Sequence, residues 1–207
     1  MPTTTTYPNG QQLISSALTI AQAAALLQSL TCGMIGVTLP SIDARNFARV
    51  RVDWPTEGQP VADTPQDDVC FIQCVPNDAE YSRVRDRSLS GSKPGPLTYT
   101  WRYTRGWKFS WCAYGPNAED NMRAVKSALF MDYFADTLSA SNLYPLPDPP
   151  EVTYLPEQLN AEWWARADFH VDLYEQVTET TIVGAVISVP IEIDTKEVTV
   201  DFTVTAS

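Results

Sequence analysis

The residues best suited to chemistry are two acids and a histidine at alternate positions of one predicted strand. Asp168, His170 and Asp172 fall within ADFHVDLYEQV, where apolar and polar residues alternate, so the three polar side chains should share one face. The inward face carries the apolar positions Ala167, Phe169, Val171 and Leu173. Such a row could transfer protons or ligate a metal. No nucleophile motif or second ligand cluster accompanies it, so we interpret it as the solvent-facing side of a strand.

Other candidate ligands are equally isolated. The sequence contains four cysteines: Cys32, Cys70, Cys74 and Cys112. They show no CxxC spacing, and His170 is the only histidine, so we expect buried free thiols rather than a zinc site. Asp63, Asp67 and Asp68 lack the spacing and the glycine of a calcium loop. No GxSxG, Walker, HExxH or GxGxxG motif occurs. We therefore assign no catalytic, cofactor-binding or metal residue and expect neither an enzyme nor a cofactor.

Composition and charge limit the partners. The 207 residues are 44% hydrophobic, which suits a globular chain, and no apolar run approaches the roughly 18 residues of a membrane span. The net charge is −11, with a balance of +1 over residues 1–108 and −12 over residues 109–207. Gripping nucleic acid needs Lys and Arg to replace phosphate counterions, so this acidity argues against it. The acidic half is either a solvated surface or one that faces DNA without holding it.

A strand followed by a helix is the element around which we expect the chain to be organised. Trp107, Phe109 and Trp111 alternate with polar or small residues and should share one buried face. Gly115-Pro116 ends the strand, and Asn117 should cap a helix over residues 117–139. The apolar stripe of that helix comprises Met122, Ala124, Val125, Ala128, Leu129, Met131 and Leu138.

The remaining pattern predicts one more main helix, over residues 11–31, and several strands. Alternating or apolar runs place these strands at 45–54, 69–75, 167–177, 181–190 and 197–205. Residues 97–115 should form one long strand or a bent pair with a bulge at Gly106, and residues 157–163 a short turn of helix. The predicted fold class is α+β, with a mostly antiparallel sheet and two main helices packed on it. We divide the chain into an extended N-terminal arm (1–10), one α+β domain (11–193) and a C-terminal strand extension (194–207).

Two segments are candidate subunit interfaces. Arg83, Arg85 and Arg87 occupy alternate positions, which suits either an acidic partner surface or an edge strand protected by charge. The C-terminal strand carries Val198, Val200 and Phe202 on one face, which needs a partner. We predict that it pairs outside the central sheet of its own subunit, on a neighbouring subunit, although a hairpin with the preceding strand is an equal alternative.

Two stretches resemble a known family. The run WCAYGPNAEDNMRAV resembles the strand-to-helix turn of the phage neck terminator (tail-completion) family, through Tyr114, Gly115, Pro116, Asn117 and Ala118. The run WWARADFHVDLYE at 163–175 resembles a strand of the same family, and the positions that match it are Trp163, Arg166, Ala167, Phe169 and Val171. The Pro-rich link between them also fits. The similarity covers residues from about 97 to 193 and extends more weakly back to about 40.

The resemblance implies a structural virion protein of the phage neck, assembled in the host cytoplasm. Such a protein terminates the tail and joins it to the head connector as a ring around the DNA channel. The implied partners are other copies of the chain in a hexamer, the head-tail connector protein, and tail tube or sheath proteins. Viral DNA would pass through without sequence-specific binding, and no membrane is involved.

An enzyme or carbohydrate-binding module is the alternative. It would use the aromatic strand and the carboxylates of Asp168 and Asp172, which lie too close together for an inverting pair.

Overall fold

Two long strands run through the chain, which the computed structural model describes over residues 2–9, 11–37, 49–52, 64–78, 83–91, 96–159, 161–183, 188–195 and 198–205. Strands β6 (Leu97–Tyr114) and β11 (Arg166–Val183) each contain 18 residues. Both contribute to each of the two units into which the chain divides. The first unit is Met1–Ala17, Arg85–Tyr103 and Thr178–Ser207, and the second is Leu18–Val84 and Thr104–Val177.

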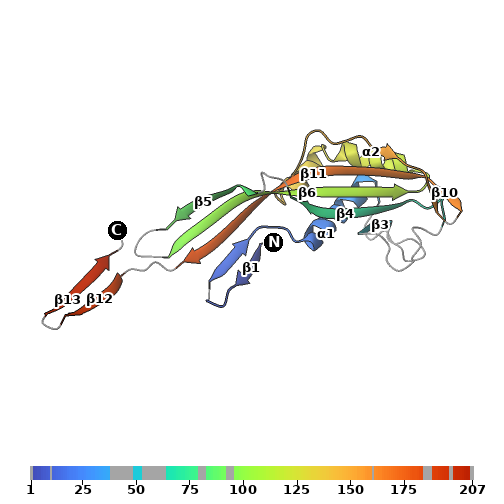
Figure 1. Cartoon of the computed structure of the whole chain (residues 1–207). Helices are drawn as coiled ribbons and strands as arrows, with labels where there is room; N and C mark the ends of the chain where they lie inside the picture. The colour runs from blue at the N-terminus through green and yellow to red at the C-terminus, as the bar shows by residue number, and fades with distance from the viewer. Residues whose placement is uncertain are drawn as a thin grey trace. The chain divides into compact units, whose positions relative to one another are not determined.

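The second unit is a sheet covered on one face by helices (Figure 1). Its strand order is β11–β6–β4–β3, where β4 is Val69–Asn77 and β3 is Val50–Val52. β4 runs antiparallel to β6 and parallel to β3. Two short strands of the Pro-rich link, β7 (Leu143–Pro145) and β8 (Thr153–Tyr154), pair with β11. The three helices are α1 (Ile20–Met34), α2 (Ala118–Ala128) and α3 (Asp132–Ser139).

The core lies between these helices and the sheet, as the alternation of the aromatic strand predicts. Trp107, Phe109 and Trp111 are fully buried there, together with helix residues such as Met122 and Val125. The Trp111 ring stacks on Phe169 of β11 with ring centroids 5.4 Å apart, and its Nε1–H donates to the Thr31 hydroxyl of α1 at 2.9 Å. The predicted inward face of β11 is confirmed as well: Ala167, Phe169, Val171 and Leu173 are all buried.

The opposite face of the sheet carries a smaller cluster under a hairpin. Strands β9 (Glu157–Leu159) and β10 (Glu162–Trp164) pair with each other, so the turn of helix predicted at 157–163 is wrong. Prolines and polar residues around this hairpin hid its extended conformation in the sequence. It places Trp164 against four buried residues of the sheet: Val69, Phe71, Cys112 and Tyr114.

Two helix predictions need correction. The helix expected over 117–139 is interrupted at Leu129–Met131, where Met131 has an extended backbone (φ −77°, ψ 140°) and α3 begins anew. The break keeps both Leu129 and Leu138 buried, although no Pro or Gly marks it. The helix expected from residue 11 begins only at Ile20, because Thr19 and Gln22 form a capping box there.

The residues before that capping box form strands of the first unit. Its sheet has the order β1–β2–β11–β6–β5, with β1 at Thr3–Thr6, β2 at Gln12–Ser15 and β5 at Arg85–Ser90. The arm predicted at 1–10 therefore contains a strand that pairs with β2. None of the described side chains in this unit is buried. The described residues of this sheet thus form a single layer of strands.

The C-terminal strand forms a hairpin with its predecessor. β12 (Ser188–Thr195) and β13 (Val198–Thr205) pair antiparallel along their whole length and make a separate two-stranded sheet. The side chains of Val198, Val200 and Phe202 lie outside the described residues, as does most of the strand predicted at 45–54. The predicted α+β class with a mostly antiparallel sheet is confirmed, and the described residues form three helices where two main ones were predicted. The division at residues 10 and 193 stays a prediction.

Candidate assembly site

The turn from β6 into α2 is held by an acid that the sequence did not suggest. Gly115 has φ +110°, and a Cβ at this position would lie 2.5 Å from Oδ1 of Asp68, so only glycine fits without displacement. The Asp68 carboxylate accepts from the backbone N–H of Asn117 at 3.0 Å and from its Nδ2 at 2.7 Å. Asn117 occupies the N-cap position but makes no side-chain cap bond. The predicted position of the helix start is therefore correct, but the predicted capping hydrogen bond from the Asn117 side chain is wrong, because that side chain is bound to Asp68 instead.

The two motif stretches meet in space. The backbone N–H of Gly115 donates to the carbonyl of Ala165 at 3.1 Å, and the Tyr114 ring meets Trp164 edge to face with centroids 6.3 Å apart. Within the first motif Pro116 is exposed and Ala118 is buried; within the second, Trp163 is 69% exposed. The neighbouring tryptophan, rather than Trp163, makes the packing contact.

A polar cluster joins the same two stretches. Arg166 donates to both carboxylate oxygens of Asp168 at 2.9 and 2.8 Å, and to Glu157 at 2.8 Å. The Tyr114 hydroxyl donates to the same Glu157 oxygen at 2.8 Å. These hydrogen bonds, from Tyr114 first and then Arg166, hold the pKa of Glu157 below its usual range, whereas burial raises the pKa of Tyr114. The cluster locks β9, β6 and β11 together, which is a structural role.

The acid–histidine–acid row is not arranged for catalysis. Asp168 is committed to Arg166, and His170 is exposed. A hollow of about 210 Å³ adjoins them, lined in part by Gln73, Lys108 and Ser110. Trp107, Phe109 and Trp111 of β6 are buried on the other face and are not free to stack on a sugar. Within the described ranges, no three His, Cys, Asp or Glu side chains are grouped so that they could hold a metal.

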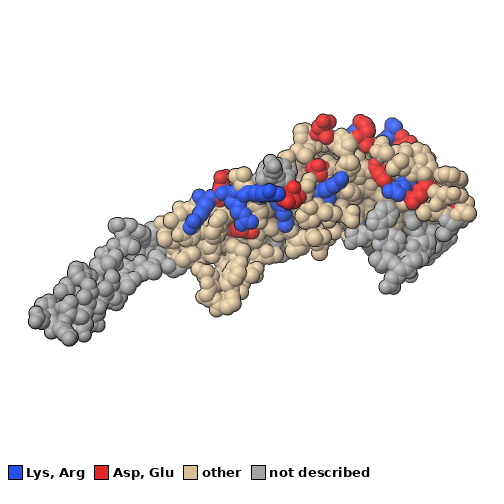
Figure 2. All heavy atoms as spheres, in the orientation of Figure 1, with Lys and Arg blue, Asp and Glu red and all other residues tan. Residues whose placement is uncertain are grey.

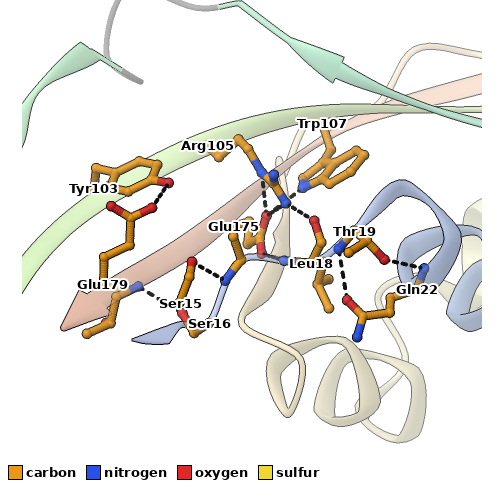
Figure 3. A network of polar contacts seen from close by, with 12 residues as sticks. Ser15, Ser16, Leu18, Thr19, Gln22, Tyr103, Arg105, Trp107, Glu175 and Glu179 are labelled. Atoms are coloured by element: carbon orange, nitrogen blue, oxygen red, sulfur yellow. Dashed lines mark hydrogen bonds and ion pairs between the residues drawn. The ribbon is translucent and has the colours of Figure 1, made fainter. Parts of the chain in front are cut away.

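A buried carboxylate holds the start of α1 to the sheet (Figure 3). Glu175 is fully buried and accepts from the backbone N–H of Leu18, from Nε of Arg105 and from Nε1 of Trp107, each at 2.7 Å. Arg105 also donates to the Leu18 carbonyl and lies over the Trp107 ring, 4.5 Å from its centroid. Sequence reasoning missed this Glu175 clasp. The sequence does contain a sign of it: Glu175 occupies one of the alternate, inward-facing positions of β11 that are otherwise apolar.

The four cysteines are buried and are not joined by disulfides, as expected. Burial raises the pKa of Cys32 and Cys70, and burial followed by the nearby Asp168 raises the pKa of Cys112 to about 12. Such thiols are poor nucleophiles and poor metal ligands at neutral pH.

The predicted arginine row is divided among different contacts. Arg83 pairs with Asp78 at 3.1 Å. On β5, Arg85 lies over the Tyr103 ring at 4.5 Å and 3.6 Å from Glu179, while Arg87 lies over the Tyr99 ring at 4.3 Å. Blue side chains gather over this sheet in Figure 2. The role of these arginines at a subunit interface stays a prediction, as does that of Val198, Val200 and Phe202.

Among the helices of the described segments, none has both the length and the apolar character needed to cross a membrane.

Comparison with known proteins gives one family. A family model described as a phage neck terminator protein matches residues 21–203. That range contains both motif stretches and their meeting point. No curated protein matches the chain at a significant level.

Proposed function

Since the chain belongs to the phage neck terminator family, and is thus a structural protein of the bacteriophage neck, we propose that it closes the tail as a ring around the DNA channel. The ring contains six copies in this proposal and joins the tail tube or sheath to the head connector. The observation that carries the proposal is the extent of the family match, which spans residues 21–203 and therefore parts of both units rather than one motif.

Two features of the structure support a scaffold role. The motif residues hold the fold together through Asp68, Glu157 and Arg166 and do not converge on a reaction centre. The surface charge also suits a conduit, because the second unit carries nineteen Asp and Glu against nine Lys and Arg. We propose that this acidic surplus lines the channel and one axial face, where like charge keeps DNA from sticking.

Two measurements test the proposal. Light scattering of the purified full chain should give a mass near six times the 23.0 kDa of one chain. A phage whose gene for this chain is interrupted should accumulate filled heads and separate tails, and the purified protein should join them in an extract. Infectious particles that form normally without the chain would refute a neck role, and a channel lined mainly by arginines would refute the charge assignment.

A further inference from the structure

No described side chain of the sheet β1–β2–β11–β6–β5 outside the second unit is buried, so its described residues show no second layer. Its register pairs Arg87 with Trp101 and Leu89 with Tyr99, so these four side chains share one face. Arg102 pairs with Asp86 and belongs to the opposite face. We call the face with Arg85, Arg87, Leu89, Tyr99 and Trp101 the basic aromatic face. Domains bury such faces against another layer, yet none of the described residues covers this one.

A surface of opposite character lies where α2 gives way to α3. Phe130, Met131 and Tyr133 are 45%, 56% and 74% exposed, which is unusual for three large apolar side chains so close in sequence. Asp132 lies between Met131 and Tyr133, Asp136 follows three residues later, and both are exposed too. We call these five residues the acidic corner. The corner lies at the break between α2 and α3, where Met131 has an extended backbone.

We infer that the basic aromatic face of one subunit packs on the acidic corner of the next subunit. This inference rests on the proposed ring, since it names the surfaces that would build it. The occupant is a second copy because the chain itself supplies both halves of the match. Guanidinium groups lying flat on tyrosine rings meet carboxylates, and Leu89 and Trp101 meet exposed apolar side chains.

The arrangement also has the right symmetry. The two surfaces differ, so the contact is head to tail, and repeating it closes a ring when the rotation per subunit divides a full turn. Tyrosine, tryptophan and arginine are the residues that dominate binding energy at protein interfaces. Stacking on Tyr99 also holds the Arg87 side chain in one orientation before it binds, which lowers the entropy lost on association.

Charge reversal tests the inference. Light scattering gives the protein concentration at which half of the chains are assembled. The double variant Arg85→Glu/Arg87→Glu should raise that concentration on the order of thirtyfold or more. Arg102→Glu is the control, because it reverses one arginine of the same sheet on the opposite face, and the single variants Arg85→Glu and Arg87→Glu are compared with it. Adding Asp132→Lys/Asp136→Lys to the double variant should restore assembly. Circular dichroism establishes that each variant is folded.

A cross-linking experiment does not depend on the charges. One copy carries Leu89→Cys and another Tyr133→Cys, and the mixture is treated with a short bismaleimide. Both positions are exposed while the four native cysteines are buried, so only the new thiols should react. The mixture should give a covalent dimer, whereas Ser88→Cys, which faces the other way, should not.

The outcomes separate this inference from the proposed function. If the wild-type chain forms rings but the double variant assembles equally well, or only the Ser88→Cys mixture cross-links, the ring stands and the inference is wrong. If the double variant still assembles but loses binding to duplex DNA or to another neck protein, the basic aromatic face serves that partner and the inference is again wrong. A wild-type chain that stays monomeric refutes the ring and this interface together.

Discussion

Replacement of Glu175 by alanine should destabilise the protein severely, because three donors share this one carboxylate. The side chain is fully buried and accepts from Leu18, Arg105 and Trp107 at 2.7 Å each. Without it, the part-buried Leu18 N–H and the buried Trp107 indole N–H lose their acceptor, and a buried orphan donor costs about 1–3 kcal/mol. Arg105 would also keep its charge without an ion-pair partner at this position.

The expected loss follows from these contacts. Removing one member of a buried ion pair typically costs about 3–5 kcal/mol, a large part of the roughly 5–15 kcal/mol that separates folded from unfolded domains. Glu175→Ala should therefore lower the free energy of unfolding by about 3–5 kcal/mol. Glu175→Gln should cost less, about 1–3 kcal/mol, because one oxygen can still accept while the new amide N–H faces Arg105.

Urea unfolding followed by circular dichroism and tryptophan fluorescence measures the loss. The midpoint should fall while the slope stays constant, because the surface exposed on unfolding is unchanged. Glu162→Ala is the control, since that side chain is exposed and should stay within about 0.5 kcal/mol of wild type. A Glu175→Ala midpoint indistinguishable from that of Glu162→Ala would refute the reasoning, because the clasp would then contribute nothing net.

Two further changes probe the core. Trp111→Ala should cost about 3–5 kcal/mol in the same assay, since the ring is 1% exposed and stacks on Phe169, and an unchanged midpoint would mean that this face is not buried. Native protein should resist thiol reagents until urea exposes all four cysteines, and rapid native labelling would contradict their burial. The pKa of Cys112 is raised from 9.0 to about 12 in the folded protein. Between these two pH values only the thiol of the unfolded protein ionises, which favours unfolding. The Cys112 thiol therefore contributes its full stabilisation below pH 9 and loses it as the pH rises toward 12. Above pH 9 the urea midpoint should accordingly fall less in Cys112→Ala than in the wild-type protein. An equal fall in both proteins would refute the role of the Cys112 thiol.

Local patterns in the sequence predicted the parts of the fold that depend on them. Alternation is a property of neighbouring residues, so it placed Trp107, Phe109 and Trp111 inward correctly. The capping box at Thr19 and Gln22 was also readable, but the apolar pairs before it fit a helix as well as a strand. The pairing of β2 with β1 and β11 decided between them, and no local pattern reports it.

The polar contacts of the candidate site could not be predicted in the same way. Asp68 and Asn117 are 49 residues apart, Tyr114 and Glu157 are 43 apart, and Trp107 and Glu175 are 68 apart. Each pair forms only once the sheet has brought its strands together, so composition and spacing give no sign of it. The helix break at Met131 was hidden for a related reason, since burial of Leu129 and Leu138 on both sides, rather than a breaker residue, sets it.

The pairing of β2 with β11 also sets an order of events during synthesis. Gln12–Ser15 lie next to Glu179–Thr181 in the sheet, so the N-terminal strands wait for residues translated much later. At about 5–20 residues per second, that wait is on the order of ten to thirty seconds. Until then only the β1–β2 hairpin can form, and a lone two-stranded hairpin is marginal in water. The sheet is therefore completed among the last parts of the chain, well after residues 85–103 of β5 and β6 have been translated.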